Sequence, residues 1–256
     1  MKVLLINKYN FIKGGSEIYT FGLKDMLIED GHEVIDFSMK SLKNQYSKYS
    51  DYFVEEIDYS NNELLNKVKN SINLIYSREA CHKLEELIKK TKPDIAHVNL
   101  IYHQLTPSIL HILKKFNIPI VFTSHDYKVI CPNYKLYNNG LCDKCINGTY
   151  INCFKEKCHK NSKAFSLLLT IEAYVHKYLK SYDLIDKIIC PSEFMKEKLI
   201  QFMQGRYGID TLNNHALFFV IALFILNIFF NNRIIMSLGY LIWLLVIYRM
   251  FSRQTY

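Results

Sequence analysis

The sequence predicts an α/β domain built on one parallel sheet, followed by a transmembrane helical hairpin. Up to residue 201, short apolar runs rich in β-branched residues alternate with longer segments of helical period. Such alternation is typical of a parallel sheet covered by helices. Beyond that point the composition changes: all 27 lysines lie at or before Lys198, and the last 55 residues contain neither lysine nor glutamate. We therefore expect two domains, 1–201 and 202–256.

The first part of the domain is a strand, a glycine-containing loop, a helix and a second strand. We expect strands at Lys2–Asn7 and Glu33–Ser38, and between them a helix at Ser16–Asp30 that ends where Gly31 breaks the pattern. Residues Met39–Asn62 are polar and rich in tyrosine, and they give no clear prediction. The helix carries on one face its apolar or small residues, which are Ile18, Phe21, Gly22, Met26 and Leu27.

The rest of the domain continues the alternation. Glu63–Lys90 has a helical period, as one helix or two, and Pro93 ends it. We expect three further strands, at Asp94–Asn99, Pro119–Ser124 and Lys187–Cys190. The helices expected around them are Thr106–Phe116 with Pro107 in its first turn, Phe165–Ser181, and Ser192–Phe202 with Ser192 as its N-cap.

Charge and targeting signals exclude some classes of function. The chain has a net charge of +8, of which the first 201 residues carry +5 from 28 basic and 23 acidic residues. The basic residues are dispersed, as at Lys89-Lys90, and this is typical of solvated helix faces, so nucleic-acid binding is not supported. No secretory signal is visible, because Asn7-Lys8 interrupts the first apolar run. We therefore expect the seven cysteines in a reducing compartment.

Candidate binding residues follow the first predicted strand. Gly14, Gly15, Ser16 and Glu17 open the first helix. Paired glycines let backbone N–H groups approach a ligand closely, and a helix N-terminus favours an anion. The alternative is a purely structural loop, with Glu17 as a first-turn residue favoured by the helix dipole. The G-x-G-x-x-G pattern is absent, so a nicotinamide cofactor is not expected.

A histidine and a carboxylate follow the fourth predicted strand. His125 and Asp126 lie where ligands bind in open α/β sheets, beyond the carboxyl ends of the strands. A histidine there can donate a hydrogen bond or shuttle a proton, and the alternative is a capping or packing role. His103 follows the third strand and is a candidate for substrate binding, whereas His97 within that strand is a core histidine by default.

Four cysteines gather in the loop 131–160. Cys142 and Cys145 form a C-x2-C pair, and Cys153 and Cys158 follow. Four thiolates at this spacing are typical of a structural zinc site, which stabilises a long loop and has no open position for catalysis. Cys131 and His159 are possible substitutes as ligands, and free thiols or disulfides remain as alternatives.

Together these segments resemble the amino-terminal half of family 4 glycosyltransferases, which have the two-Rossmann GT-B architecture. The resemblance runs from Met1 to about Gln201. It implies that the glycine loop lines a cleft near acceptor and donor phosphates, and that His125 lies beside the transferred sugar. The segments that carry it are Lys2–Asn7 with the glycine loop, Asp94–Leu105, Thr123–Pro132, the cysteine-rich loop and Pro191-Ser192-Glu193-Phe194.

The chain departs from that family after Gln201. Members continue into a second Rossmann domain that binds the nucleotide-sugar, and the residues after Gln201 have no α/β pattern. We therefore expect the acceptor-side half of a retaining sugar transferase for polysaccharide or glycolipid assembly, truncated or fused, with a sugar or glycolipid acceptor. It would use a nucleotide-sugar only if a donor domain is supplied. The alternative is a non-catalytic, zinc-stabilised, membrane-anchored binding protein or gene-fusion remnant.

The last segment predicts two membrane spans. Residues 212–230 form a run that would span about 28 Å as a helix, against about 30 Å of hydrocarbon. Residues 234–250 are just long enough if Arg249 reaches the interface. Basic residues flank the pair on both outer sides, with only Arg233 between the spans, so both termini are expected at the cytoplasmic side of the membrane. The segment resembles small two-span bacterial membrane proteins, and a buried pair of soluble helices is the alternative.

Overall fold

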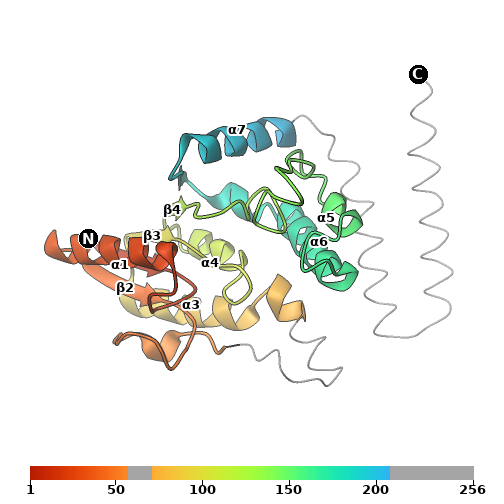
Figure 1. The fold of residues 1–256 in the computed structure, drawn as a ribbon. Helices are drawn as coiled ribbons and strands as arrows, with labels where there is room; N and C mark the ends of the chain where they lie inside the picture. Colours follow the sequence, from red (N-terminus) through yellow and green to blue (C-terminus); the bar gives the residue numbers. More distant parts are fainter. Residues whose placement is uncertain (57–70, 208–256) are drawn as a thin grey trace, which may run out of the picture. The chain divides into compact units, whose positions relative to one another are not determined.

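The structure, a computed structural model, describes residues 1–56 and 71–207 (Figure 1). The chain divides into two units, Met1–Met203 and Gln204–Tyr256, and the described residues lie almost wholly in the first. The predicted spans, 212–230 and 234–250, lie outside the described residues. Of the helices within residues 1–56 and 71–207, none has the length and apolar character that crossing a membrane requires.

The first unit is built on a five-stranded parallel sheet with the order β2-β1-β3-β4-β5. This confirms the predicted α/β class with a parallel sheet. All five strands coincide with predicted ones, although each ends one residue earlier. The strands are β1 (Lys2–Ile6), β2 (Glu33–Phe37), β3 (Ile95–Val98), β4 (Ile120–Thr123) and β5 (Lys187–Ile189).

The helices alternate with these strands along the chain. Ser77 caps α3 by accepting a hydrogen bond from the backbone N–H of Ala80 at 3.2 Å, and Ser192 caps α7 in the same way through Met195 at 3.2 Å. The second cap confirms a sequence prediction. The helices are α1 (Gly15–Glu29), α3 (Arg78–Thr91), α4 (Ile109–Lys115), α5 (Ile151–Lys155), α6 (Lys163–Tyr178) and α7 (Glu193–Tyr207), with 3₁₀ turns η1 (Ser50–Tyr52) and η2 (Ser181–Leu184).

The two faces of the sheet differ in chemistry. One face is apolar and joins residues of α3 and α4 in the main hydrophobic core. Alternate strand residues point to opposite faces, and at Asp36, His97 and Thr123 the other face carries polar side chains. The apolar face consists of Leu4, Ile6, Ile35, Phe37, Ala96, Val98, Ile120 and Phe122. The strands were predicted as apolar runs, and the polar side chains on the second face depart from that prediction.

Helix α1 packs with a polar face inwards. The predicted apolar face is not the buried one, because Ile18 and Met26 are 61% and 62% exposed. The buried positions are Glu17 and Thr20, and α1 contributes no residue to the main core. The reason is the polar face of the sheet beneath the helix: Lys24 reaches both oxygens of Asp36 at 2.9 Å.

Three other elements differ from the sequence expectation. Helix α4 begins at Ile109, because Thr106 has a left-handed backbone (φ 60°) and bonds Ser108 through its hydroxyl, so Pro107 lies before the helix. The cysteine-rich loop contains the short helix α5, which was not predicted. Helix α7 continues to Tyr207, past the predicted end at Phe202.

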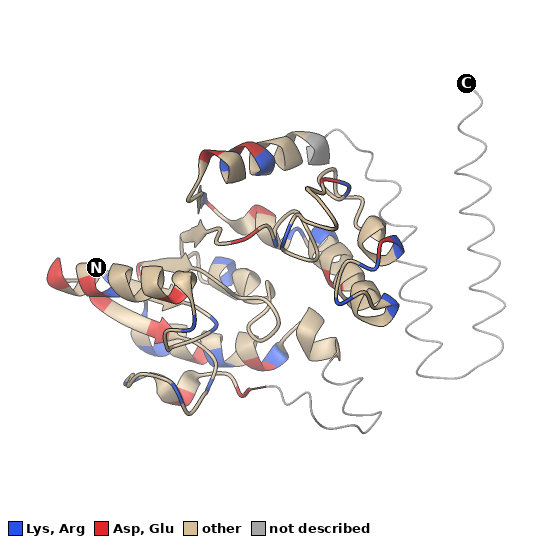
Figure 2. Cartoon of the chain, in the orientation of Figure 1, with Lys and Arg blue, Asp and Glu red and all other residues tan. Residues whose placement is uncertain are grey.

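Charged residues of both signs are interspersed along the described helices and strands (Figure 2). Most of the ion pairs are exposed, as at Lys144–Glu156, whose side chains are 55% and 39% exposed. Two of the described pairs are largely buried: the side chains of Lys128–Glu172 are 5% and 1% exposed, and those of Lys24–Asp36 are 18% and 11% exposed.

Candidate functional site

His125 lies at the carboxyl edge of the sheet, just after β4. Its Nε2 atom is 2.9 Å from Oδ1 of Asn99, which follows β3. The ring of Tyr19, from α1, meets the imidazole edge-to-face with 5.1 Å between centroids. Burial lowers the pKa of His125, although the Glu17 carboxylate raises it in part. The imidazole is therefore neutral at pH 7, and three elements of the fold meet at it.

Glu17 is held beneath this edge by short polar side chains. It is 2% exposed, and its Oε1 accepts hydrogen bonds from Ser16 Oγ at 2.9 Å and from Asn7 Nδ2 at 3.3 Å. Asn7 in turn accepts the backbone N–H of Leu100 at 3.2 Å. The first glycine loop and the loop after β3 are thus joined through one asparagine, and the structure brings Ser16, Glu17 and His125 to the same edge.

Hydrogen bonds also join His97, Thr123 and Tyr19 at this edge. His97 Nε2 lies 2.8 Å from Thr123 Oγ1, which also meets the Tyr19 hydroxyl at 3.2 Å. Burial and the nearby His125 lower the pKa of His97 to about 4. His97 is a neutral, hydrogen-bonded strand histidine, and it fixes Thr123 and Tyr19 rather than facing solvent.

Asp126 turns away from His125. Its carboxylate accepts a hydrogen bond from the Tyr102 hydroxyl and one from the backbone N–H of Lys128 at 2.9 Å. Burial raises the pKa of Asp126, and the same carboxylate and burial raise that of Tyr102. The Lys128 ammonium contacts Glu172 of α6 and donates to the carbonyl of Pro132 at 3.1 Å. These contacts fix the loop that carries His125 to α6.

His103 packs on Tyr102, the hydrogen-bond partner of Asp126. Its backbone is left-handed (φ 75°), and its ring packs edge-to-face on Tyr102 at 5.2 Å between centroids. Burial lowers the pKa of His103 to about 2, and its Nδ1 is a buried atom without a hydrogen-bond partner among the described residues. The structure therefore does not place His103 next to His125.

Gly14 and Gly15 border open space. Gly14 is the N-cap of α1 with an extended backbone, and a Cβ atom there would lie 3.8 Å from Glu17 Oε2. Among residues 1–56 and 71–207, a Cβ at Gly15 would meet nothing within 4 Å. Among the described residues, steric contacts therefore require glycine at neither position.

This geometry predicts that Gly15→Ala leaves the fold intact. Replacing a glycine by alanine where its backbone conformation suits both residues stabilises a protein by about 0.4–1 kcal/mol. We expect an equal or slightly higher midpoint of urea unfolding. The matched control is Gly148→Ala, because Gly148 has φ +74° and its Cβ would lie 2.7 Å from Lys177 Nζ; that variant should lose stability. A clear loss in Gly15→Ala would mean that the loop is packed more tightly than described.

The loop before the glycines is basic and aromatic. Lys13 Nζ donates to the Tyr9 hydroxyl at 2.7 Å and lies 4.1 Å from its ring centroid, and Lys8 Nζ lies 5.0 Å from the same centroid. Burial raises the pKa of Tyr9, but the Lys13 hydrogen bond and the Lys8 charge outweigh it, so the pKa is lowered. Two cations are thus concentrated next to the open glycine loop.

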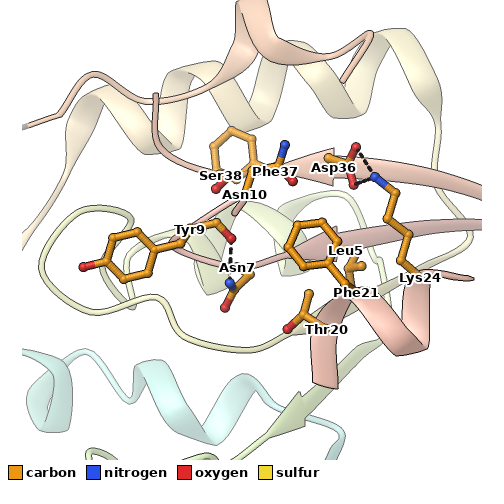
Figure 3. Close-up of a pocket in the computed structure, with 10 residues that line it drawn as sticks. All are labelled: Leu5, Asn7, Tyr9, Asn10, Thr20, Phe21, Lys24, Asp36, Phe37 and Ser38. Atoms are coloured by element: carbon orange, nitrogen blue, oxygen red, sulfur yellow. Dashed lines mark hydrogen bonds and ion pairs between the residues drawn. The ribbon is translucent and has the colours of Figure 1, made fainter. Parts of the chain in front are cut away.

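A small pocket lies behind this loop, between α1 and strands β1 and β2 (Figure 3). Its charged groups are already paired with each other: Lys24 contacts Asp36, which also accepts from Ser47 Oγ at 2.8 Å. The pocket therefore offers no unpaired charge to a ligand. It is lined by Leu5, Asn7, Tyr9, Asn10, Thr20, Phe21, Lys24, Asp36, Phe37 and Ser38.

Four of the five cysteines of the 131–160 loop lie in the main core or pack against it: Cys131, Cys145, Cys153 and Cys158. All seven cysteines are free, and within residues 1–56 and 71–207 no group of three or more His, Cys, Asp or Glu side chains is placed to hold a metal. Cys145 and Cys153 are buried in the main core, and burial raises the pKa of Cys145 to about 12. Zinc bound by Cys142, Cys145, Cys153 and Cys158 remains a prediction that the structure does not support.

Sequence reasoning missed several residues at this edge. Asn7 and Asn99 were predicted as the last residues of their strands, without a role. Their position was the available signal, because an amide side chain at the carboxyl end of a parallel strand points into the region where ligands bind. Tyr19 and Thr123 gave no signal, since their hydrogen bond joins residues far apart in the sequence.

A single parallel sheet with polar side chains at its carboxyl edge defines an α/β domain of the ligand-binding type. Residues 13–209 match Glycosyltransferase Family 4. The chain belongs to this family, because the match covers more than half of its length.

One relative is an uncharacterized 42.6 kDa protein in the cps region of Klebsiella pneumoniae. It is 29% identical to this chain over 153 residues, which is 55% of this chain and 40% of that protein. The chain thus spans less than half the length of the relative that it matches. No solved structure matches the chain.

Proposed function

We propose that this chain supplies the acceptor-side half of a retaining sugar transferase that acts in polysaccharide or glycolipid assembly at the cytoplasmic membrane. The observation that carries the proposal is the carboxyl edge of the sheet, where the His125 imidazole after β4, the Asn99 amide after β3 and the buried Glu17 carboxylate next to the glycines of α1 lie together. The described residues contain one sheet domain, so the nucleotide-sugar would be bound by a second domain. The relative from a cps region supports the polysaccharide context.

The proposed division of labour follows from charge. Transfer of a sugar from a nucleoside diphosphate requires positive groups that stabilise the departing diphosphate. Near this edge the described residues offer such groups at Lys8 and Lys13, which lie against the Tyr9 ring, and at the N-terminus of α1. His125 is suited to a hydrogen bond with a sugar hydroxyl. Attachment to the lipid bilayer through residues 212–230 and 234–250 is part of the proposal.

The test is a chimera in which a donor domain from a family 4 enzyme with a known nucleotide-sugar follows Tyr207. We expect the chimera to transfer sugar, and His125→Ala to lower turnover by about 100-fold or more. His82→Ala is the control, because His82 lies on α3 with its side chain 75% exposed. A chimera that is active but indifferent to His125→Ala would mean that the catalytic edge has been misplaced.

The unmodified chain completes this experiment. We expect no measurable transfer from nucleotide-sugars by the chain alone, because the diphosphate would lack most of its stabilisation. Robust transfer by the chain alone would refute the division into an acceptor side and a separate donor side. Binding of a sugar acceptor without transfer, in both the chain and the chimera, would favour a non-catalytic binding protein.

A further inference from the structure

The side chain of Asn99 faces His125 with its oxygen, not with its amino group. Asn99 is fully buried, and its backbone N–H donates to the carbonyl of Ile6 at 2.9 Å. The side-chain Nδ2 lies 3.5 Å from that same carbonyl oxygen. Turning the amide over would direct Oδ1 at the carbonyl oxygen, so that two acceptors would face each other in a buried place. The orientation observed is therefore the one that the backbone of β1 enforces.

An oxygen acceptor at this position decides which nitrogen of His125 carries the proton. An amide oxygen can only accept, so the Nε2 atom 2.9 Å away must be the N–H donor. A neutral imidazole carries one proton. Nδ1 of the same ring is then the atom with the lone pair, and it can only accept.

Burial lowers the pKa of His125 and so favours the neutral ring, while the Glu17 carboxylate opposes this in part. The charged or titratable groups that face it are Glu17 and Tyr19 from α1 and His97 from β3. His97 is itself neutral and bonds Thr123, and the Tyr19 hydroxyl bonds the same threonine. Glu17 is the one carboxylate among these groups, and its Oε1 is occupied by Ser16 and Asn7.

We propose that Asn99 is a positioning residue that fixes His125 as the Nε2–H tautomer and so makes Nδ1 an acceptor for a sugar hydroxyl. This inference rests on the proposed function for the identity of the ligand, while the tautomer itself is a property of the chain alone. It also explains why an asparagine, with one accepting and one donating atom, follows β3: its oxygen faces His125 and its amino group faces the Ile6 carbonyl.

The tautomer can be measured directly by nitrogen NMR on the full chain with ¹⁵N-labelled histidine. His125 is assigned by the resonance that disappears in His125→Gln. At neutral pH we expect Nε2 of His125 to show the resonance of a protonated ring nitrogen and Nδ1 that of an unprotonated one. The reverse assignment, or a fully averaged pair, would overturn the proposal.

Two variants test the role of Asn99. Asn99→Leu removes the acceptor while keeping the size, and we expect His125 to become a mixture of tautomers. Asn99→Asp keeps an acceptor and adds a charge, so the Nε2–H tautomer should persist while the pKa of His125 rises by about one unit or more. If Asn99→Leu does not fold, Asn99→Asp and the wild-type spectrum still decide. An unchanged pKa in Asn99→Asp would contradict the contact.

The chimera separates this inference from the proposed function. If the tautomer is as expected and the chimera is inactive, the positioning by Asn99 stands and the transferase proposal fails. If the chimera is active and its activity depends on His125 but the tautomer is reversed, the transferase proposal stands and the role of Asn99 is wrong. If the transferase proposal and the role of Asn99 are both correct, Asn99→Asp should shift the acid limb of the pH–rate profile to higher pH, together with the His125 pKa measured by NMR.

Discussion

Glu172→Ala should destabilise the domain by about 3–5 kcal/mol, because it leaves the Lys128 ammonium buried without its carboxylate. The two side chains are 5% and 1% exposed, so solvent cannot replace the lost partner. Only the carbonyl of Pro132, 3.1 Å from Lys128 Nζ, would remain. Urea unfolding followed by circular dichroism, with wild type and variant at the same pH, measures the difference.

Two further variants show whether the loss comes from the buried charge. Glu156→Ala removes a partner of the exposed pair Lys144–Glu156 and should change stability far less. Replacing both buried partners, as Lys128→Met with Glu172→Leu, should recover much of the loss, since no uncompensated charge is then buried. A double variant as unstable as Glu172→Ala would show that shape, and not charge, dominates at this position.

Lowering the pH from about 6.5 to about 4 should cost the domain roughly 3 kcal/mol through His176 alone. His176, on α6, is 1% exposed, with Nε2 2.7 Å from the Ile75 carbonyl oxygen and Nδ1 2.9 Å from Ser181 Oγ. Burial lowers its pKa from 6.5 to about 4. Between these two values the unfolded chain binds a proton that the folded chain excludes, so stability falls as the pH falls. Below about pH 4 both the folded and the unfolded chain bind the proton, so this loss of stability does not increase further.

The measurement is the free energy of unfolding at several pH values between 7.5 and 4. His176→Gln should lower stability at pH 7, because it loses one of the two hydrogen bonds, and should flatten the dependence on pH. The exposed His82 provides the control: His82→Gln should keep the wild-type slope. If His176→Gln keeps that slope too, another buried histidine, such as His97 with its pKa of about 4, causes the loss.

The order of strands and helices could be predicted from the sequence because it depends on local apolar runs. Lys2–Asn7 and Asp94–Asn99 have no strong competing pattern, and both form parallel strands at nearly the predicted bounds. The exact start of a helix was harder to predict where it depends on the turn before it. The start of α4 depends on the left-handed Thr106 and its bond to Ser108, which a single sequence does not display.

The orientation of α1 could not be predicted, because apolar periodicity identifies a helix face but not what lies beneath it. Asp36 lies on the strand that follows α1 and Thr123 on one far away in the sequence, and they form hydrogen bonds with Lys24 and Tyr19. At the candidate site, His125 and the glycine loop could be named from their place after strands. The pairings of Asn99 with His125 and of Asp126 with Tyr102 needed the three-dimensional structure.

Helix α1, which packs with a polar face towards the sheet, should open locally more easily than α3. A helix held by hydrogen bonds and ion pairs at a polar face, and absent from the main core, is less costly to detach than one held by buried hydrocarbon. Its amide hydrogens should therefore exchange with solvent deuterium through local opening, well before those of α3. Since α1 carries Glu17 and Tyr19, such opening would release two of the groups around His125 while the sheet stays folded. A ligand that bridges the glycine loop and His125 would then slow this exchange.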